Sequence, residues 1–190
     1  MKALDQFLPR YDFNELHSVK VKASPEKTLT AVKDLTPSEL SPLVGMLLGL
    51  RDLPSRLTSR ARKTSTKTES FLDQLLEGDF ILLADRSDEV VFGLVGQFWK
   101  FIGERKVVIT SPDDFINFSQ TDFAKVAANL QVQAVDGYTL LSTETRIGSP
   151  DAQTKGKFAF YWRLISIGSG WIRILWLNAI KRRAENNLQT

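Results

Sequence analysis

The single histidine of the chain, His17, is the best candidate for acid–base chemistry near neutral pH. It lies in the alternating stretch Phe13–Ala23, where it shares an apolar face with Val19 and Val21. This alternation predicts a half-buried strand with the histidine turned inward. An inward histidine can serve as a base in a cavity, or it can be a hydrogen-bonded core or rim residue. The pattern leaves both interpretations open.

Glu144 and Arg146 form a second candidate, an acid and a base on one predicted strand. The hairpin register described below places both on the outer face of a sheet. There they would form a cross-strand charge ladder with Lys20 and Lys22 of the first strand. If the register were shifted by one residue, both would line the interior and bind the polar head of a ligand.

Aromatic side chains recur at helical spacing near the C-terminus, where Trp162 and Trp176 fall on one face of a predicted helix. They could stack on an aromatic ligand, or they could simply belong to the core. The two interpretations overlap, because the wall of an apolar pocket is also part of the core.

A basic segment, residues 51–68, carries several Arg and Lys residues against one acid, Asp52, among many Ser and Thr. Its few apolar anchors predict a flexible loop, with contact to an anionic membrane surface as the alternative. No aromatic residue is interleaved with its charges, so nucleic-acid binding by base stacking is not expected.

Several site types are excluded by composition. The chain has no cysteine and one histidine, which excludes disulfides, thiolate zinc sites, a cysteine nucleophile and metal sites built from several histidines. It contains neither a GxGxxG pattern nor a P-loop. We therefore expect no metal and no cofactor.

The hairpin Ala124–Ile147 is the element that positions most candidate residues. Asp136-Gly137 is a type I′ turn signal, and a two-residue loop pairs Val135 with Tyr138. The predicted buried face consists of Ala124, Val126, Ala128, Leu130, Val132, Leu141, Thr143, Thr145 and Ile147. Small residues on this face leave room for a closely packed helix or for a ligand.

Caps, turns and periodicity predict the remaining elements. We expect a helix opened by Ser24-Pro25, a helix from about Pro42 to Leu50, a short helix over Glu69–Glu77, strands over Phe80–Asp85, Val90–Trp99, Lys106–Thr110 and Phe115–Phe118, and a terminal helix over Asp151–Asn186. The apolar face of that last helix includes Phe158, Trp162, Ile165, Ile172, Trp176 and Ile180. Gly168-Ser169-Gly170 should bend this helix near its middle or split it in two.

Composition and charge indicate a single domain spanning residues 1–190. Apolar residues make up 43% and charged residues 25% of the chain, which are globular values. A net charge of +3 and a pI of 9.2 reflect only a small excess of base, and we expect no nucleic-acid partner. The N-terminus lacks an apolar leader segment, and Arg163 and Arg173 interrupt the most apolar stretch. We expect a soluble, cytoplasmic protein.

Three segments carry a resemblance to a known superfamily: the strand-to-helix step His17–Glu26, the hairpin turn Asp136–Leu141 and the terminal helix. Their order resembles the helix-grip fold of the START-like (SRPBCC) superfamily, which includes lipid-transfer START domains, plant pollen allergens and polyketide cyclases. The segments Leu141–Arg146 and Tyr161–Ile165 also resemble an uncharacterised bacterial branch of it. The resemblance implies an α+β helix-grip fold: a curved antiparallel sheet of about six or seven strands wrapped around a long C-terminal helix, with two short helices after the first strand. It implies an apolar cavity and no particular reaction.

The expected function is the binding of an apolar small molecule or lipid between the sheet and the terminal helix. The expected cavity residues are Val19, Val21, Ala124, Val126, Ala128, Leu130, Leu141, Thr143, Thr145, Trp162, Ile165, Ile172 and Trp176. One alternative is a cyclase- or hydrolase-type enzyme that uses His17 and cavity hydroxyls. Another is an interaction protein with a filled core that dimerises. Fold alone does not choose among these, and the sequence leaves the oligomeric state open.

Overall fold

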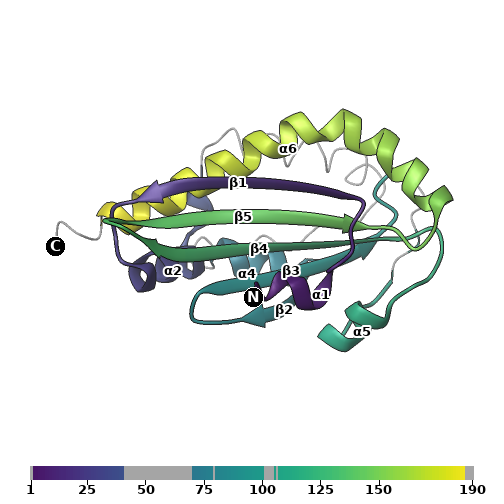
Figure 1. Cartoon of the computed structure of the whole chain (residues 1–190), viewed down its shortest axis with the longest axis horizontal. Coiled ribbons are helices and arrows are strands. Elements are labelled where there is room, and N and C mark those ends of the chain that lie inside the picture. Colours follow the sequence, from purple (N-terminus) through teal and green to yellow (C-terminus); the bar gives the residue numbers. More distant parts are fainter. Residues whose placement is uncertain (1, 41–69, 79, 101–104, 106, 187–190) are drawn as a thin grey trace.

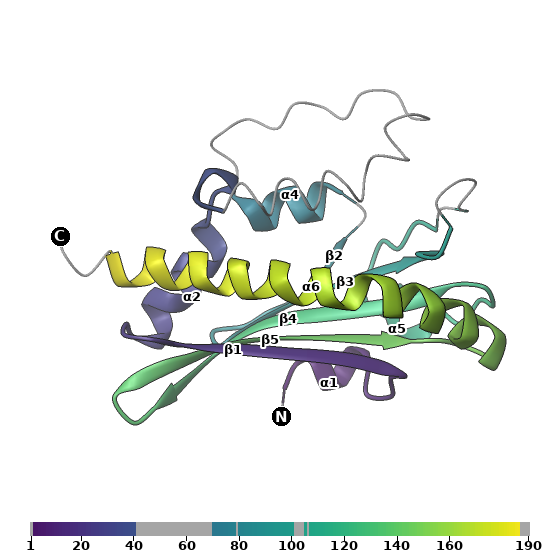
Figure 2. The ribbon, with the colours of Figure 1, turned by 90° about the horizontal axis from the view of Figure 1, so that it is seen from above.

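A computed structural model describes residues 2–40, 70–78, 80–100, 105 and 107–186. Within these residues the chain forms one five-stranded antiparallel sheet with the strand order β1-β5-β4-β3-β2. The long helix α6, with α2 and α4, lies on one side of the sheet, and α1 lies on the other (Figures 1 and 2). The elements are α1 (Leu4–Phe7), β1 (Phe13–Val21), α2 (Pro25–Asp34), η1 (Pro37–Glu39), α4 (Phe71–Glu77), β2 (Ile81–Asp85), β3 (Glu89–Gly96), α5 (Pro112–Asn117), β4 (Ala124–Val135), β5 (Tyr138–Gly148) and α6 (Ala152–Asn186).

The hairpin β4–β5 has the predicted register. Val135 pairs with Tyr138 across the two-residue loop, and Val132 pairs with Leu141. Gly137 has φ = 78°, a left-handed conformation that glycine adopts without a steric penalty. The predicted type I′ turn is wrong, because that turn needs positive φ at both central residues and Asp136 does not have it. The turn therefore fixes which side chains of both strands face α6.

Helix α6 is 35 residues long and continues through Gly168 and Gly170. The expectation that these glycines split the helix is wrong. The helix is instead curved along its length, arching over the sheet (Figure 1). It packs mainly on β1, with further contacts to β5, β4 and α2. Because β1 is an edge strand, α6 covers one margin of the sheet.

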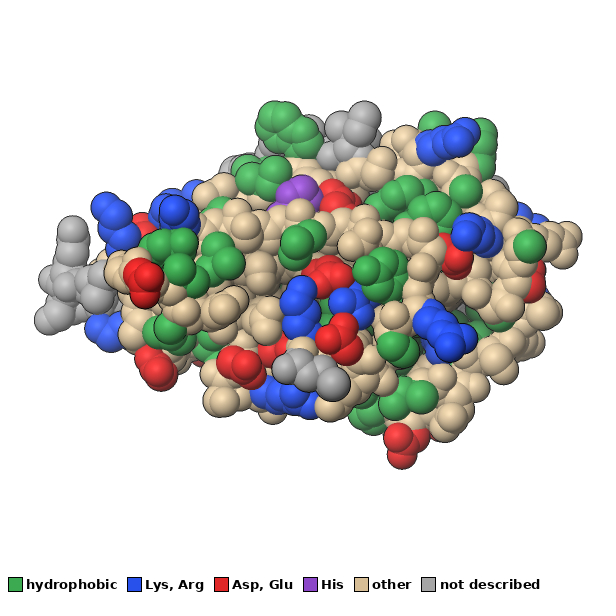
Figure 3. Space-filling model, viewed as in Figure 1, with side chains coloured by type: hydrophobic (Ala, Val, Ile, Leu, Met, Phe, Trp, Pro, Cys, Tyr) green, Lys and Arg blue, Asp and Glu red, His purple; other side chains and the backbone are tan. Residues whose placement is uncertain are grey.

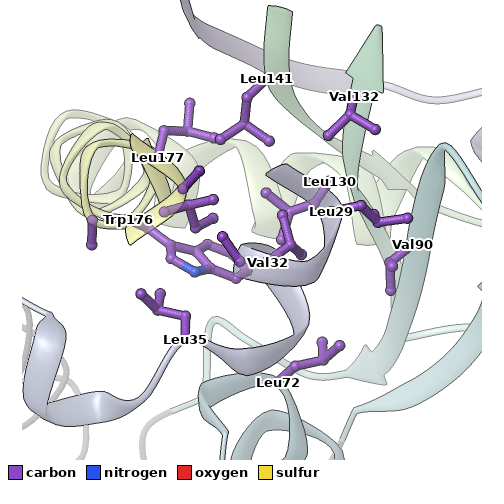
Figure 4. Close-up of a cluster of buried hydrophobic side chains, with 14 of the residues drawn as sticks. Leu29, Val32, Leu35, Leu72, Val90, Leu130, Val132, Leu141, Trp176 and Leu177 are labelled. Atoms are coloured by element: carbon purple, nitrogen blue, oxygen red, sulfur yellow. The ribbon is translucent and has the colours of Figure 1, made fainter. Parts of the chain in front are cut away.

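The main apolar core lies where α2, α6 and the sheet meet. Trp176, Leu177 and Ile180 of α6 pack there with residues of α2 such as Val32 and of the hairpin such as Leu141 (Figure 4). Each large apolar side chain buried in this way contributes roughly 1.5–3 kcal/mol. Ser24 caps α2 by accepting a hydrogen bond from Lys27 N. This core holds the C-terminal half of α6 in place.

Two predicted strands are not strands. Residues 107–110 have no regular structure, and Pro112–Asn117 forms helix α5. Ser111 caps α5 by accepting a hydrogen bond from Asp114 N, and Pro112 occupies its first turn. The described residues therefore contain five strands, not six or seven. The predicted helix 42–50 and the basic segment 51–68 lie outside the described residues.

Candidate ligand site between the sheet and α6

A polar cluster interrupts the apolar packing between the sheet and α6. At one end of the interface lies the aromatic cluster around Phe158, and at the other lies the main core around Trp176. Between them β1 contributes Glu15 and His17, β5 contributes Thr143 and Thr145, and α6 contributes Ser169 and Arg173. These residues occupy the middle of three different elements, so the cluster crosses the interface as a band.

Arg173 is the centre of this band. Its Nε donates a hydrogen bond to Thr145 Oγ1 at 3.1 Å, and its Nη1 lies 2.9 Å from Glu15 Oε2 and 2.5 Å from Ser169 Oγ. Only 14% of the side chain is exposed. No partner for Nη2 occurs among the described residues. The guanidinium therefore has one donor group, Nη2, that no described residue accepts from.

His17 and Glu15 form the second part of the band. His17 Nε2 lies 2.7 Å from Glu15 Oε1, and the two side chains are 22% and 17% exposed. His17 pairs across the sheet with Thr143, whose hydroxyl donates to the Asn129 carbonyl. The prediction that His17 faces α6 is correct. The histidine, purple in Figure 3, can be seen from outside near the margin formed by β1.

Glycine at position 170 allows α6 to approach β1 this closely. A Cβ added there would lie 2.5 Å from Glu15 Oε1 and 3.4 Å from His17 Nε2. The first distance is well below an ordinary contact, whereas the second is an ordinary van der Waals contact. Gly170 therefore lets the Glu15 carboxylate lie against the helix backbone, where it accepts from both His17 and Arg173.

Burial sets the electrostatics of the cluster. Loss of water lowers the pKa of Arg173 below its usual value, and the neighbouring Glu15 partly offsets this effect. An arginine remains protonated at neutral pH even so. A buried cation beside one carboxylate and two hydroxyls can bind a further anion through its free Nη2. A histidine bonded to a carboxylate can in principle also transfer protons.

The expected cavity residues all belong to the α6 side of the sheet. The fully buried ones are Val21, Ala124, Ala128, Leu130, Leu141, Thr143, Thr145 and Trp176. The half-buried ones are Val19, Val126, Trp162, Ile165 and Ile172. The half-buried group surrounds the polar cluster on both sides, since Val126, Trp162 and Ile165 contact the aromatic cluster and Val19 and Ile172 contact the main core.

Both candidate tryptophans lie among other aromatic rings. Trp162 stacks on Phe158, with ring centroids 5.9 Å apart, and Phe13 lies beside both. Trp176 packs edge-to-face with Phe71 at 5.1 Å. The Trp176 Nε1 atom is buried without a hydrogen-bond partner. Each ring is thus a part of the core on the α6 side.

Glu144 and Arg146 lie on the outer face, as the register predicts, but they are not a surface ladder. Arg146 Nε donates to Glu144 Oε1 at 2.7 Å, and both residues are buried beneath the segment that contains α1. Their other charged partners are Lys2 and Asp5. The prediction that Lys20 and Lys22 lie beside them is wrong, because Leu16 is the residue of β1 opposite Glu144.

These outer-face charges stabilise each other. Burial acts to raise the pKa of Glu144, but hydrogen bonds from Arg146 and Lys2 outweigh it and lower that pKa. Burial likewise acts to lower the pKa of Arg146, and Glu144 and Asp5 raise it instead. Figure 3 shows acidic and basic side chains gathered over the middle of this face. We assign them to anchoring the N-terminal segment.

A hollow of about 420 Å³ also lies on the outer face. It is lined by the segment after α1, the end of α5 and the start of β4, including Leu8, Phe118 and Lys125. The ammonium group of Lys125 donates hydrogen bonds to the carbonyls of Phe115 and Ile116. The lining also includes the exposed Arg10 and is partly polar, so this hollow is a second concave surface on the face opposite the Arg173 cluster.

Sequence reasoning missed two members of the cluster. Glu15 shares the inward face of β1 with His17, but its acidic side chain was not expected there. Arg173 was treated only as an interruption of an apolar stretch. It lies one helical turn after Ser169, which falls on the apolar face, and that spacing is the signal that could have identified it. Among the described residues, no group of three or more His, Asp or Glu side chains is arranged to hold a metal ion.

Comparisons with known proteins give little further information. No family model matches the chain, and no curated protein matches its sequence. Among solved structures, the crystal structure of Ara h 8.0201, a Bet v 1 or START-like helix-grip protein, is similar at a TM-score of 0.28 and 9% identity, covering 94% of this chain and 99% of that one. A likeness at this level carries no argument about ligand or family. No helix in the described part of the chain is long and apolar enough to cross a membrane. The chain is an α+β protein with an open five-stranded antiparallel sheet and a long C-terminal helix.

Proposed function

We propose that the protein binds an amphipathic ligand between the sheet and α6, with an anionic head at Arg173 and an apolar body among the half-buried side chains beside it. The observation that carries this proposal is the unused Nη2 of a guanidinium that is only 14% exposed. Taking a charged group out of water is costly, and one carboxylate and two hydroxyls satisfy only part of its donor capacity.

A carboxylate or phosphate fits this position chemically. Either can accept hydrogen bonds from the Nη2 group of Arg173, and burial strengthens such bonds. The apolar body would contact Val126, Trp162 and Ile165, which are half-buried although they face α6. Glu15 and His17 lie on the edge strand β1, and their side chains are 17% and 22% exposed. The ligand head would therefore enter from that edge.

A second candidate function is acid–base catalysis at the same place. It is favoured by the 2.7 Å contact between His17 Nε2 and Glu15 Oε1, which orients the imidazole as a carboxylate orients the base of many hydrolytic sites. In this case His17→Gln should abolish turnover of a bound ester while ligand binding persists. Loss of both together would indicate that His17 only shapes the site.

The test is a titration with a fluorescent fatty acid and with its methyl ester. We expect the wild type to bind the acid more tightly than the ester, and Arg173→Met to remove that difference. Lys27→Met, which removes an exposed cation from α2, is the matched control and should keep it. Equal binding of acid and ester by the wild type would contradict the role of Arg173, and no binding of either would contradict the proposed function.

A further inference from the structure

The solvent-facing side of α6 carries a stripe of large apolar side chains. Phe160, Leu164, Trp171 and Ile174 are 71%, 66%, 62% and 42% exposed. Their spacings of four, seven and three residues put them on one helical face. Scattered exposed apolar residues are normal, but a continuous exposed stripe with two aromatic rings commonly marks an interaction surface.

The shape of α6 presents this stripe outward. The helix arches away from the sheet, and its convex side faces solvent (Figure 1). Leu164 and Trp171 lie near the middle of the arch by their positions in the helix. Apolar side chains project along this margin of the molecule (Figure 3). The stripe is therefore the part of α6 that would first touch a flat surface.

The charges on α6 are almost all positive. The helix carries Lys155, Lys157, Arg163, Arg173, Lys181, Arg182 and Arg183 against the single acid Glu185. Lys155 and Lys157 are paired with Asp12 and Asp122. Arg163 and Arg182 are exposed and have no acidic partner among the described residues. On an ideal helix Arg163 borders the apolar stripe, and Arg182 lies on the same face about two turns beyond Ile174.

We propose that the solvent-facing side of α6 docks on an anionic lipid surface, with the stripe entering the headgroup boundary and Arg163 and Arg182 contacting lipid headgroups. An apolar face with Trp, Phe and Leu beside basic residues is what binding in the plane of a membrane interface requires. The proposal does not depend on the ligand site, which uses the opposite side of the same helix. If both hold, α6 lies between the membrane and the bound ligand.

The charges favour a lipid surface over a second copy of the chain. A symmetric dimer would bring the same patch of both copies together. Arg163 would then face a patch without an unpaired acid among the described residues, because Glu185 already accepts from Lys22 N and lies at the far end of α6. An anionic headgroup layer supplies the missing negative charge, and each basic residue near such a surface adds to binding.

The experiment is co-sedimentation of the full chain with phosphatidylcholine vesicles, with and without about 30 mol% phosphatidylglycerol, which supplies the anionic charge. We expect binding only to the anionic vesicles, and weaker binding at about 1 M salt, where surface charges are screened. Arg163→Gln should weaken binding about fivefold, the effect of one basic residue at such a surface. The double variant Leu164→Ser/Trp171→Ser should not sediment.

The matched control is Leu16→Ser. Leu16 is 56% exposed and lies on β1, away from the stripe. It should bind as the wild type does, and circular dichroism should show all variants folded, since each changed residue is exposed. Absence of binding to anionic vesicles, or equal binding by the double variant, would overturn the proposal. So would a wild-type dimer in analytical ultracentrifugation without lipid that the double variant converts to a monomer, because the stripe would then bind a second copy.

Discussion

Replacing Gly170 by alanine tests whether α6 packs closely against Glu15, apart from the effect of alanine on helix stability. The new Cβ would lie 2.5 Å from Glu15 Oε1, so this oxygen must retreat by about 1 Å to reach an ordinary contact. That movement weakens the bonds that Glu15 makes to His17 at 2.7 Å and to Arg173 at 2.9 Å. Gly168→Ala is the matched control, because nothing lies within 4 Å of a Cβ at that position.

The two variants should change the free energy of unfolding in opposite directions. Alanine is more favourable than glycine in a helix interior by about 0.5–1 kcal/mol, so Gly168→Ala should stabilise the protein by that amount. In Gly170→Ala the same gain is opposed by the loss of one or two charge-assisted hydrogen bonds, at about 1.5 kcal/mol each for these partly exposed groups. The result is a net loss of about 0.5–2.5 kcal/mol. Because both variants share the gain in helix propensity, they should differ by the lost bonds alone, about 1.5–3 kcal/mol.

The measurement is urea unfolding of both variants, with thermal unfolding in parallel. For a chain of this size the difference corresponds to about 3–12 °C in Tm. The reasoning would be refuted if Gly170→Ala were stabilised as much as Gly168→Ala. In that case the Glu15 carboxylate either does not lie against α6 or moves without cost, and the cluster around Arg173 would lack the rigidity that we assign to it.

Three further predictions address other parts of the fold. Gly137→Val should lower the Tm, because valine is strained at φ = 78°; an unchanged Tm would rule out the assigned turn. Hydrogen bonds from Lys157, and further ones from Lys100, lower the pKa of Asp122 to about 2, so its contribution to stability is complete above the ordinary value of 3.8 and is lost as the pH falls through about 2. Asp122→Asn should therefore be less stable than the wild type at pH 6, and urea unfolding should show the two converging near pH 2; a difference that does not change with pH would contradict the ion pairs. Glu89→Gln should expose the N-terminal segment to hydrogen exchange without affecting α6, because the buried Glu89 carboxylate accepts from the backbone N–H groups at the start of α1; protection that stays the same would show that this cap is dispensable.

The sequence predicted the parts of the fold that local rules determine. The Asp136-Gly137 turn allows few hairpin registers, and alternation then assigns the faces of both strands. Ser24-Pro25 is an N-cap followed by proline, and it starts α2 at Pro25. The start of α4 differs from the prediction by two residues, because Ser70 provides its cap.

Errors occurred where local signals have two meanings. Ser111-Pro112-Asp113-Asp114 is compatible with a turn between strands and with the start of a helix, and the structure uses it as the cap of α5. No local signal predicted α1, whose four residues are held by the distant Glu89. The burial of Glu144 and Arg146 follows from the same tertiary contact, which no periodicity encodes.

The candidate site was predictable only in outline. Alternation placed His17 and Thr145 on the α6 side of the sheet, as found. The hydrophobic pattern could not identify Glu15 and Arg173 as partners, because a charged residue on an apolar face is ordinarily an exception to that pattern. Their pairing depends on how closely α6 approaches β1. Gly170 allows this close approach, and local sequence patterns do not show such packing.

Native mass spectrometry of the purified full chain tests the central claim most directly. We expect a co-purified ligand whose mass and fragmentation identify an apolar acid or phosphate ester, released when the protein is denatured. Arg173→Met, purified in parallel and verified as folded, should carry less of it, because the guanidinium that binds the anionic head is gone. A wild-type protein that is free of ligand and remains free of it after incubation with excess fatty acid would contradict the account.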